Sequence, residues 1–344
     1  MRDGVRPAVD VFVPNRDYSR YLPQCLDSVL GQEGVDVRVL VVDNASTDGS
    51  IEVAERYQER DARVSLLRHP EDRGLVTSLQ EGLDWCRAEF ALNLSADDQL
   101  TPGSLSRAVR LLEARPDLGF VYGPAVRHRD GAEPSHVRQY GSAHKVWAGQ
   151  QWLHHTARTG KNPVFSPEVL LRTAPAQAVG YHHELPLCPD LGMWLGLAAR
   201  APVGHLRGAR QALYRLHPSS MMHTQGWVAA LEGRWRAYTL LVERDAAHVA
   251  RPEQLLAEAA RSLALEAVGT VELFTDWGRR GQLPDSDMLA FAQRLWPDVV
   301  ASSAWRACER AQQRPRWSPV RLGHLVGHKA HSEARELLRR QLGA

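Results

Sequence analysis

The sequence predicts an α/β fold with a mostly parallel sheet, followed by a helical C-terminal region. Short runs rich in β-branched residues alternate with stretches of helical spacing from Ala8 to about Val126. The runs are almost continuously apolar, which is typical of parallel strands that helices cover on both faces. Polar residues follow the runs directly, at the strand ends where such sheets bind ligands. After Thr224 the composition shifts to Ala, Leu, Glu and Arg.

In the first part of the chain we expect five strands: Val9–Val13, Val37–Val42, Val64–Leu67, Phe90–Leu94 and Phe120–Tyr122. Two helices between them are expected from apolar faces formed by Leu22, Leu26, Val29 and Leu30, and by Leu105, Ala108, Val109 and Leu112. The segment from His128 to about Gly160 is rich in Gly, His, Arg, Gln and Trp and has weak periodicity. We therefore expect it to form long loops or a lid over a site.

Beyond this segment, a short helix is expected after Asp190 and a strand at Gln211–Leu216. Amphipathic spacing then predicts four helices: Trp227–Val242, Pro252–Leu273, Ser286–Leu295 and Ser332–Leu342. We place a domain over residues 1–223 and a helical region over 224–344.

Composition excludes several classes of protein. The formal net charge of +2 and the lack of a Lys/Arg block argue against binding to nucleic acid. Four scattered cysteines without a Cys-x-x-Cys pair give no sign of a disulfide framework or a structural zinc site. No apolar run approaches the roughly 20 residues that span a bilayer, and no signal peptide opens the chain. We expect no transmembrane segment and a cytoplasmic protein.

Two groups of carboxylates follow predicted strands. Asp43 begins the run Asp43–Ser50; local turns and caps explain Ser46–Ser50, but a buried strand-end carboxylate needs a partner, and a ribose or base edge would provide one. Asp97 and Asp98 follow the fourth strand, and adjacent carboxylates repel each other unless a cation lies near them. A hard divalent ion such as Mg²⁺ or Mn²⁺, shared with phosphate oxygens, meets that need. The alternative is a solvated loop with two capping Asp residues.

Several motifs in one order carry a resemblance. The string Val13–Leu22, the string Cys25–Gln32 and the run Asp43–Ser50 resemble the opening of the family-two glycosyltransferases. The resemblance covers roughly Val9–Val126 closely and Asn162–Met222 more loosely. It implies a GT-A fold, a nucleotide-sugar half over about 1–127, an acceptor half over about 128–223, and transfer that inverts the anomeric carbon.

The same resemblance implies roles for individual residues. Pro14 and its neighbours Asn15 and Arg16 would flank the nucleobase, and Asp43 would bind the base or ribose. Ser95, Asp97 and Asp98 would form the Asp-x-Asp-type motif that grips the ribose and a Mn²⁺ or Mg²⁺ ion on the diphosphate. Which of the two Asp residues binds the metal stays open.

Departures from the family pattern qualify these roles. Ser95 stands where many members carry the first Asp, and Arg16-Asp17 replaces the usual Tyr-Asn, so we expect weaker stacking on the base or an unusual base. Arg73 reaches a phosphate or is a surface arginine; both interpretations stay open.

The acceptor half offers a base and a further metal ligand. Asp190, in a segment like the family's acidic motif, would be the general base that an inverting transfer needs; a plain helix N-cap is the alternative, and His182, His183 and Glu184 are the next candidates for the base. His217 lies in a segment where the family brings a His near the metal and diphosphate.

The leading hypothesis is therefore an inverting, metal-dependent transferase. It uses a nucleotide diphosphate sugar, with a UDP-sugar as first expectation, and an unknown acceptor such as a natural product, a glycan precursor or a peptide. A catalytically inactive scaffold and a nucleotidyltransferase are the alternatives. For the C-terminal helices, a homodimer interface, an extended acceptor site and a docking site for a partner all stay open.

Overall fold

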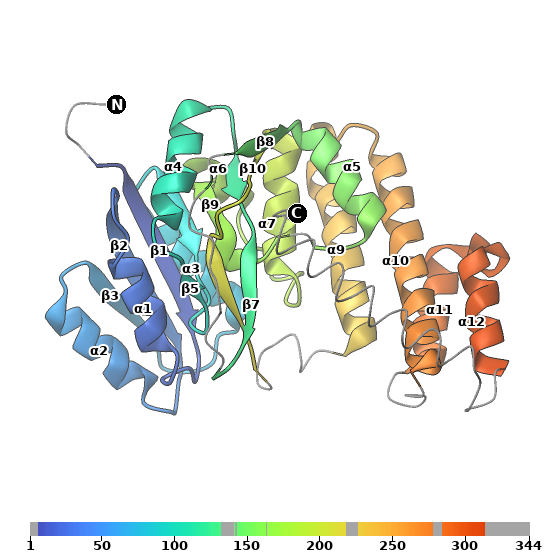
Figure 1. Cartoon of the computed structure of the whole chain (residues 1–344), viewed down its shortest axis with the longest axis horizontal. Coiled ribbons are helices and arrows are strands. Elements are labelled where there is room, and N and C mark those ends of the chain that lie inside the picture. Colours follow the sequence, from blue (N-terminus) through green and yellow to red (C-terminus); the bar gives the residue numbers. More distant parts are fainter. Residues whose placement is uncertain are drawn as a thin grey trace. The chain divides into compact units, whose positions relative to one another are not determined.

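The structure of the chain is a computed structural model that describes residues 6–131, 141, 143–162, 164–217, 226–277 and 284–313. These residues form two compact units (Figure 1). The first unit contains the described chain up to Trp152 together with 164–217, and the second contains Leu153–Asn162 together with the described residues from 226 onward.

An eight-stranded sheet forms the centre of the first unit, in the order β3-β2-β1-β4-β9-β6-β10-β8. Strands β1 to β4 are parallel, and β6 is parallel to β10, whereas β9 and β8 run antiparallel to their neighbours. The strands are β1 Ala8–Asn15, β2 Asp36–Asn44, β3 Val64–His69, β4 Phe90–Asn93, β6 Phe120–Tyr122, β8 His144–Trp147, β9 Val169–Arg172 and β10 Val203–Leu206.

A second sheet has three strands in the order β5-β11-β7. They are β5 Gln99–Leu100, β7 Ala125–Arg129 and β11 Ala212–Leu216. Strand β11 pairs in antiparallel fashion with β5 and in parallel with β7. Strand β5 begins directly after the turn of residues 95–98, which contains Asp97 and Asp98 and is called the carboxylate turn below. The small sheet therefore joins this turn to the residues of β11.

Helices cover both faces of the large sheet. Along β1, Val11 and Val13 join one apolar core with residues of α1, α2 and α4, whereas the side chain of Phe12 points to the opposite face. There α3 approaches so closely that a Cβ at Gly82 would lie 2.6 Å from the Phe12 ring. The helices of this unit are α1 Leu22–Leu30, α2 Ser50–Arg60, α3 Leu75–Trp85, α4 Ser104–Ala114, α6 Thr173–Val179 and α7 Pro189–Arg200, with the short 3₁₀ turn η1 Ser166–Glu168.

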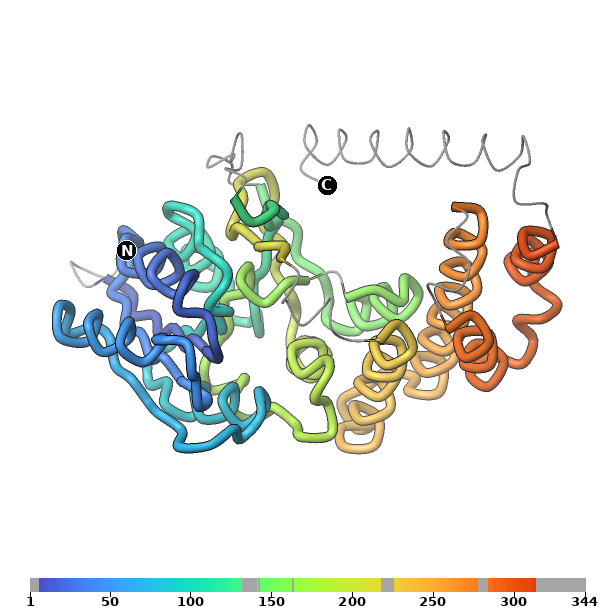
Figure 2. Tube along the Cα trace, turned by 90° about the horizontal axis from the view of Figure 1, so that it is seen from below, coloured from blue at the N-terminus to red at the C-terminus, as the bar shows by residue number. Residues whose placement is uncertain are grey.

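The second unit is helical. Helix α10 packs against α9, α11 and α12, which are coloured from yellow to red in Figure 2. Leu263, Val268, Met288 and Phe291 are among the fully buried side chains of its core. The elements are α9 Trp227–Asp245, η2 Ala246–His248, α10 Pro252–Asp276, α11 Asp285–Leu295, η3 Pro297–Ala301 and α12 Ser303–Gln313. Over the described ranges, no helix is long and apolar enough to cross a membrane.

The fold class and all five predicted strands of the first part are confirmed, and so are the strand near Gln211–Leu216 and three of the four C-terminal helices. The fourth, Ser332–Leu342, lies outside the described residues. The expectation of loops over 128–160 is wrong where the structure describes that segment. It contains β8 and α5 (Gly149–Thr159), because Trp152, Leu153 and Ala157 make a buried helical face that the polar residues around them obscure.

Candidate active site

The first two strands end in a pair of polar residues. Asn15 of β1 and Asp43 of β2 are neighbours in the register of the sheet. The Asp43 carboxylate is fully buried and accepts hydrogen bonds from Asn15 Nδ2 (2.8 Å), Ser46 N (2.9 Å) and Ser46 Oγ (2.6 Å). Asn15 and Ser46 thus supply the partners that this buried carboxylate needs, and contact of Asp43 with a base or ribose stays a prediction. Asn15 Oδ1 is a buried atom without a hydrogen-bond partner in the described structure, an acceptor that a ligand N–H or O–H would satisfy.

Arg16 follows Asn15 and reaches across to the connection between β3 and α3. Its guanidinium pairs with the carboxylate of Asp72, and both side chains are about half exposed. Asp72 also accepts hydrogen bonds from Asn44 Nδ2 (2.6 Å) and Gly74 N (2.9 Å). The hydrogen bond from Gly74 and the partners Asn44 and Arg16 hold the pKa of Asp72 below its usual value.

Arg73 lies beside this pair, but its guanidinium is held by Glu81. Glu81 also binds His69, with 2.5 Å between Glu81 Oε2 and His69 Nε2. The Arg73 backbone N–H donates to Asn44 Oδ1 (2.8 Å). Pro14, one residue before Asn15, is half-buried and pairs in register with Val42. The structure thus gathers Pro14, Asn15, Arg16, Asp43 and Arg73 at one edge of the sheet.

The turn after β4 separates the two adjacent carboxylates. Ser95 opens the turn, and its carbonyl accepts the Asp98 N–H at 3.0 Å. Asp98 is 2% exposed, and its Oδ1 accepts the backbone N–H of Arg215 at 2.8 Å. Burial and the charge of Asp97 raise the pKa of Asp98 well above its usual range. Asp97 instead turns toward His217, with 2.9 Å between Asp97 Oδ2 and His217 Nε2.

Asp97 and His217 have side chains of the kind that bind divalent metal ions. A hydrogen bond of 2.9 Å joins Asp97 Oδ2 and His217 Nε2, so the two side chains converge on one place. Among the described residues, no group of three His, Cys, Asp or Glu side chains forms a metal cage. An ion at this position would therefore depend on ligand oxygens to complete its shell, as Mg²⁺ and Mn²⁺ do on phosphates. The pair fits such an ion.

Arg215 is a site residue that sequence reasoning missed, although it lies in the segment singled out for His217. It is 6% exposed, and its Nε donates to the carbonyl of Asp97 at 2.9 Å. Its Nη atoms bind Gln24 Oε1 (2.7 Å) and Asp130 Oδ1 (3.2 Å). Together with its backbone bond to Asp98, these contacts tie β11 to the carboxylate turn.

Asp190 lies in the first turn of α7, beyond the N-cap position, which Cys188 occupies. Its Oδ1 accepts the Leu191 N–H at 2.8 Å, and Ser166 Oγ lies 3.4 Å from its Oδ2. Its charge raises the pKa of Tyr181, after the larger effect of burial. Because Cys188 is the N-cap of α7, the alternative prediction that Asp190 is a plain helix N-cap is wrong. His183 and Glu184, two of the next candidates for the base, are exposed in the connection before α7, and His182 is half-buried there.

Glu168 is a second acid that the sequence did not flag. It is 6% exposed at the end of η1, where its Oε1 accepts the Phe165 N–H at 3.1 Å and its Oε2 is buried without a partner. Burial raises its pKa to about 8, and its own charge contributes to the raised pKa of Asp98. Nothing in the string Ser166-Pro167-Glu168 predicts that this glutamate is buried in the site.

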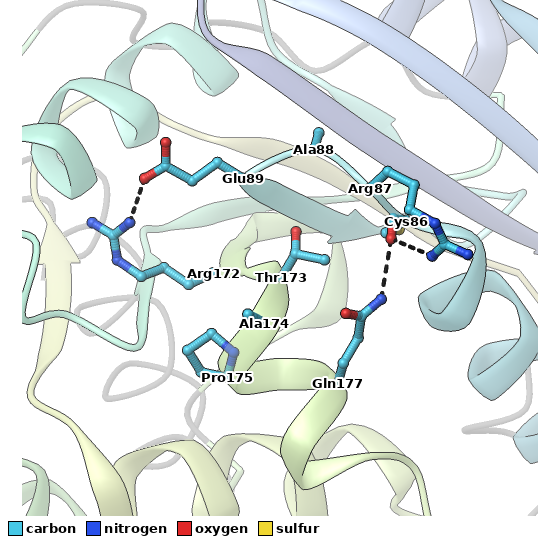
Figure 3. A pocket seen from close by; sticks show the side chains of 9 residues that line it. All are labelled: Cys86, Arg87, Ala88, Glu89, Arg172, Thr173, Ala174, Pro175 and Gln177. Carbon is cyan, nitrogen blue, oxygen red and sulfur yellow. Dashed lines mark hydrogen bonds and ion pairs between the residues drawn. The ribbon is translucent and has the colours of Figure 1, made fainter.

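A pocket of about 360 Å³ lies at the opposite end of β4, where Phe90 pairs with Arg172 (Figure 3). Arg172 donates to Glu89 Oε1 (2.7 Å), Leu118 O (3.0 Å) and Leu112 O (2.6 Å). Its guanidinium is thus already occupied by protein acceptors. The pocket is separate from the polar edge described above.

Comparison with known proteins points to one family. The family model described as "Glycosyl transferase family 2" matches residues 10–174. The EpsH protein of Bacillus subtilis strain 168, which carries a glycosyltransferase name, is 29% identical over 112 residues, which are 33% of this chain and 32% of that protein. A Mycobacterium tuberculosis protein, MT1568, is 26% identical over 211 residues, or 58% of this chain and 64% of its own length. The matches thus span less than two thirds of these relatives.

Solved structures share the fold. Staphylococcus aureus TarS in complex with UDP-GlcNAc superposes with a TM-score of 0.63 and 14% identity, covering 89% of each chain. The mannosyltransferase PcManGT of Pyrobaculum calidifontis, in complex with GDP-Man and Mn²⁺, gives a TM-score of 0.55 and 18% identity over 98% of this chain and 89% of that one. The expected GT-A fold is confirmed.

Proposed function

We propose that this chain, which belongs to glycosyltransferase family 2 through residues 10–174, moves a sugar from a nucleoside diphosphate sugar to an acceptor hydroxyl with inversion at the anomeric carbon. The observation that carries the proposal is the convergence of Asp97 and His217, 2.9 Å apart, at the sheet edge that also holds Asn15 and Asp43. A metal-bridged diphosphate beside a nucleoside pocket is the ligand that this arrangement suits.

In the proposed donor complex, the nucleoside lies over the ends of β1 and β2. Asn15 Oδ1 accepts a hydrogen bond from the base or ribose, which would satisfy the buried acceptor that has no partner in the protein. Asp43 holds the Asn15 side chain in place and shares the same ligand edge. Ser95, which opens the turn, would contact the ribose. TarS and PcManGT, which share the fold, were solved in complex with UDP-GlcNAc and GDP-Man, which supports a nucleoside diphosphate sugar without choosing the base.

Asp97 and His217 would hold the Mn²⁺ or Mg²⁺ ion on the diphosphate. When bound, such an ion supplies Lewis-acid stabilisation of the charge that develops on the departing nucleotide. Asp98 has a different task in this scheme: its carboxylate fixes the turn by accepting the Arg215 N–H at 2.8 Å. Arg215 in turn holds the Asp97 carbonyl, so the Asp97 carboxylate is presented in one orientation.

Asp190 would act as the general base. It takes the proton from the acceptor hydroxyl as that oxygen attacks C1 on the side opposite the leaving diphosphate, and inversion follows from this geometry. Its place in the first turn of α7 and the Leu191 N–H bond stabilise the carboxylate form that a base must have. Ser166 Oγ, 3.4 Å away, limits the orientation of the carboxylate.

The decisive experiment measures release of nucleoside diphosphate from a panel of nucleotide sugars, with Mn²⁺ or Mg²⁺ and water as the surrogate acceptor. Slow release of the diphosphate with free sugar supports a transferase. Release of sugar 1-phosphate together with nucleoside monophosphate would identify a nucleotidyltransferase, and binding without any product would identify an inactive scaffold. Asp190→Asn provides the matched inactive control.

We propose that the helical unit forms the interface of a homodimer. Trp227 of α9 is 48% exposed and Val300 is 44% exposed, so this unit presents large apolar side chains to its surroundings. Sedimentation velocity of the wild type and of Trp227→Ser tests it. A monomer at all concentrations would refute it.

A further inference from the structure

One group of side chains beside Asp190 is not used by the proposed mechanism. Strands β7 and β11 pair in parallel, and Arg127 is the register partner of Tyr214. Because side chains alternate along a strand, Arg127 and Tyr214 share one face of the small sheet, whereas Arg215 and its register partner His128 share the other. Arg215 serves the carboxylate turn; the opposite face has no assigned role.

Phe165, just before η1, completes this group. The Arg127 guanidinium carbon lies 4.6 Å from the centroid of the Phe165 ring, and the Phe165 and Tyr214 rings are 4.7 Å apart. Stacking on an aromatic ring holds the plane of a guanidinium while its edge N–H groups stay available. Such a held fork is suited to a carboxylate or a phosphate, which it binds through two parallel hydrogen bonds.

The group lies next to the proposed general base. Ser166 follows Phe165 directly and contacts Asp190. Tyr214 lies close to both the carboxylate turn and Asp190. Burial is the largest cause that raises its pKa, and the charges of Asp98, Asp97 and Asp190 raise it further. The charge of Arg127 lowers it. The Arg127–Phe165–Tyr214 group therefore borders the place where an acceptor must present its hydroxyl to Asp190.

The charge of Arg127 has no counter-charge in this group. Its side chain is exposed, and no carboxylate in the described part of the chain forms an ion pair with it. Glu168 is a nearby acid whose charge interacts with Arg127, but burial raises the Glu168 pKa to about 8, so this acid is mostly neutral at pH 7. A positive charge is thus left available to a ligand.

We propose that the Arg127–Phe165–Tyr214 group is an acceptor subsite that binds an anionic group, a phosphate or a carboxylate, next to the hydroxyl that receives the sugar. This inference rests on the proposed transferase function and adds the acceptor class to it. Arg127 pairs with the anion, and the two rings pack against the adjoining carbon skeleton.

The test compares three acceptors with one carbon skeleton: glycerol, D-glycerate and sn-glycerol 3-phosphate. Ligand-observed NMR measures their binding in the presence of saturating UDP and Mg²⁺, which keeps the diphosphate site filled. We expect the two anions to bind about 10- to 100-fold more tightly than glycerol, the range typical of a charged hydrogen-bonded pair. In Arg127→Gln that difference should disappear, while UDP affinity and the rate of donor hydrolysis stay at the wild-type values.

Arg129→Gln is the matched control, because Arg129 is also exposed and lies two residues further along β7. It should retain the preference for anions. Equal binding of glycerol and the anions overturns the inference, as does an equal loss in Arg129→Gln, which would indicate diffuse charge. Weaker UDP binding by Arg127→Gln would assign the arginine to the donor and overturn it as well. If no nucleotide sugar is ever hydrolysed, the proposed function fails, whereas the binding test of the subsite remains decisive.

Discussion

Asp97 and His217 are 120 residues apart in the chain, yet Asp97 Oδ2 lies 2.9 Å from His217 Nε2. The contact results from the pairing of β5 with β11, which carries the residues after the carboxylate turn alongside those that lead to His217. Arg215 reinforces it with bonds to both Asp97 and Asp98. The rings of Tyr18 and Tyr21 enclose the imidazole, with centroids 5.7 Å and 5.1 Å away. This pair is therefore held by long-range structure.

The first prediction concerns metal-dependent binding. Asp97→Asn should weaken binding of UDP in the presence of Mn²⁺ by about tenfold or more, because the neutral amide is a poorer ligand for a hard divalent ion. EDTA should have a similar effect on the wild type. Isothermal titration calorimetry measures both. Asp117→Asn, at an exposed ion pair with Arg115, is the control and should bind normally. Undiminished binding by the double variant Asp97→Ala/Asp98→Ala would rule out the metal assignment.

The second prediction concerns the choice of nucleobase. Arg16 forms an ion pair with Asp72 at the edge where we place the nucleoside, and a guanidinium so engaged cannot stack as a tyrosine ring does. We expect a weak preference among UDP, GDP, ADP and dTDP, and a stronger preference for UDP in Arg16→Tyr. Competition titrations measure the ratios. Arg68→Tyr, which removes the exposed pair with Glu55, should leave them unchanged. A strong UDP preference that Arg16→Tyr does not alter would show that this position is irrelevant.

Much of this architecture follows from local pattern. Near-continuous apolar runs between helical stretches predicted β1 to β4, and polar residues after each run predicted the edge where Asn15, Asp43 and Asp97 lie. Because parallel strands place their carboxyl ends at one edge of the sheet, the order of apolar and polar residues along the chain was enough to predict which residues lie at that edge. The helix α5 was missed because buried Trp152 and Leu153 are followed by the polar His154 and His155.

Other features depend on contacts that no local pattern contains. The Asp43 carboxylate is satisfied by Asn15 and Ser46, and only the register of β1 on β2 shows that Asn15 comes close enough. The burial of Glu168 and the position of Phe165 over Arg127 arise from tertiary packing of η1 against the small sheet. Sequence spacing carries no information on such pairs.

The third prediction concerns pH and stability. Burial raises the pKa of Glu168 from its ordinary 4.5 to about 8, so the folded state holds this proton more tightly than the unfolded state. The associated stability is fully present below about pH 4.5 and is lost as pH rises to about 8. Glu168→Gln, which stays neutral, should gain stability relative to the wild type by on the order of 2–4 kcal/mol between pH 5 and pH 8.

Urea unfolding at pH 5, 6.5 and 8 measures the effect of Glu168→Gln. A constant difference between Glu168→Gln and the wild type at all three pH values would contradict the prediction.

The last prediction tests whether Asp190 is the general base or only a structural residue at the start of α7. If Asp190 takes the acceptor proton, Asp190→Asn keeps its size but loses that capacity, and transfer should fall about 10²- to 10⁴-fold with little change in UDP affinity. If Asp190 only stabilises the start of α7 through the Leu191 N–H, Asn should replace it with little loss, since an amide oxygen accepts the same bond. Single-turnover assays and calorimetry on the same folded preparations measure the two quantities, with Ser166→Ala as a milder comparison because it removes only the hydroxyl near the carboxylate. Near-normal transfer by Asp190→Asn would place the base elsewhere, with His182, His183 and Glu184 as the next residues to replace.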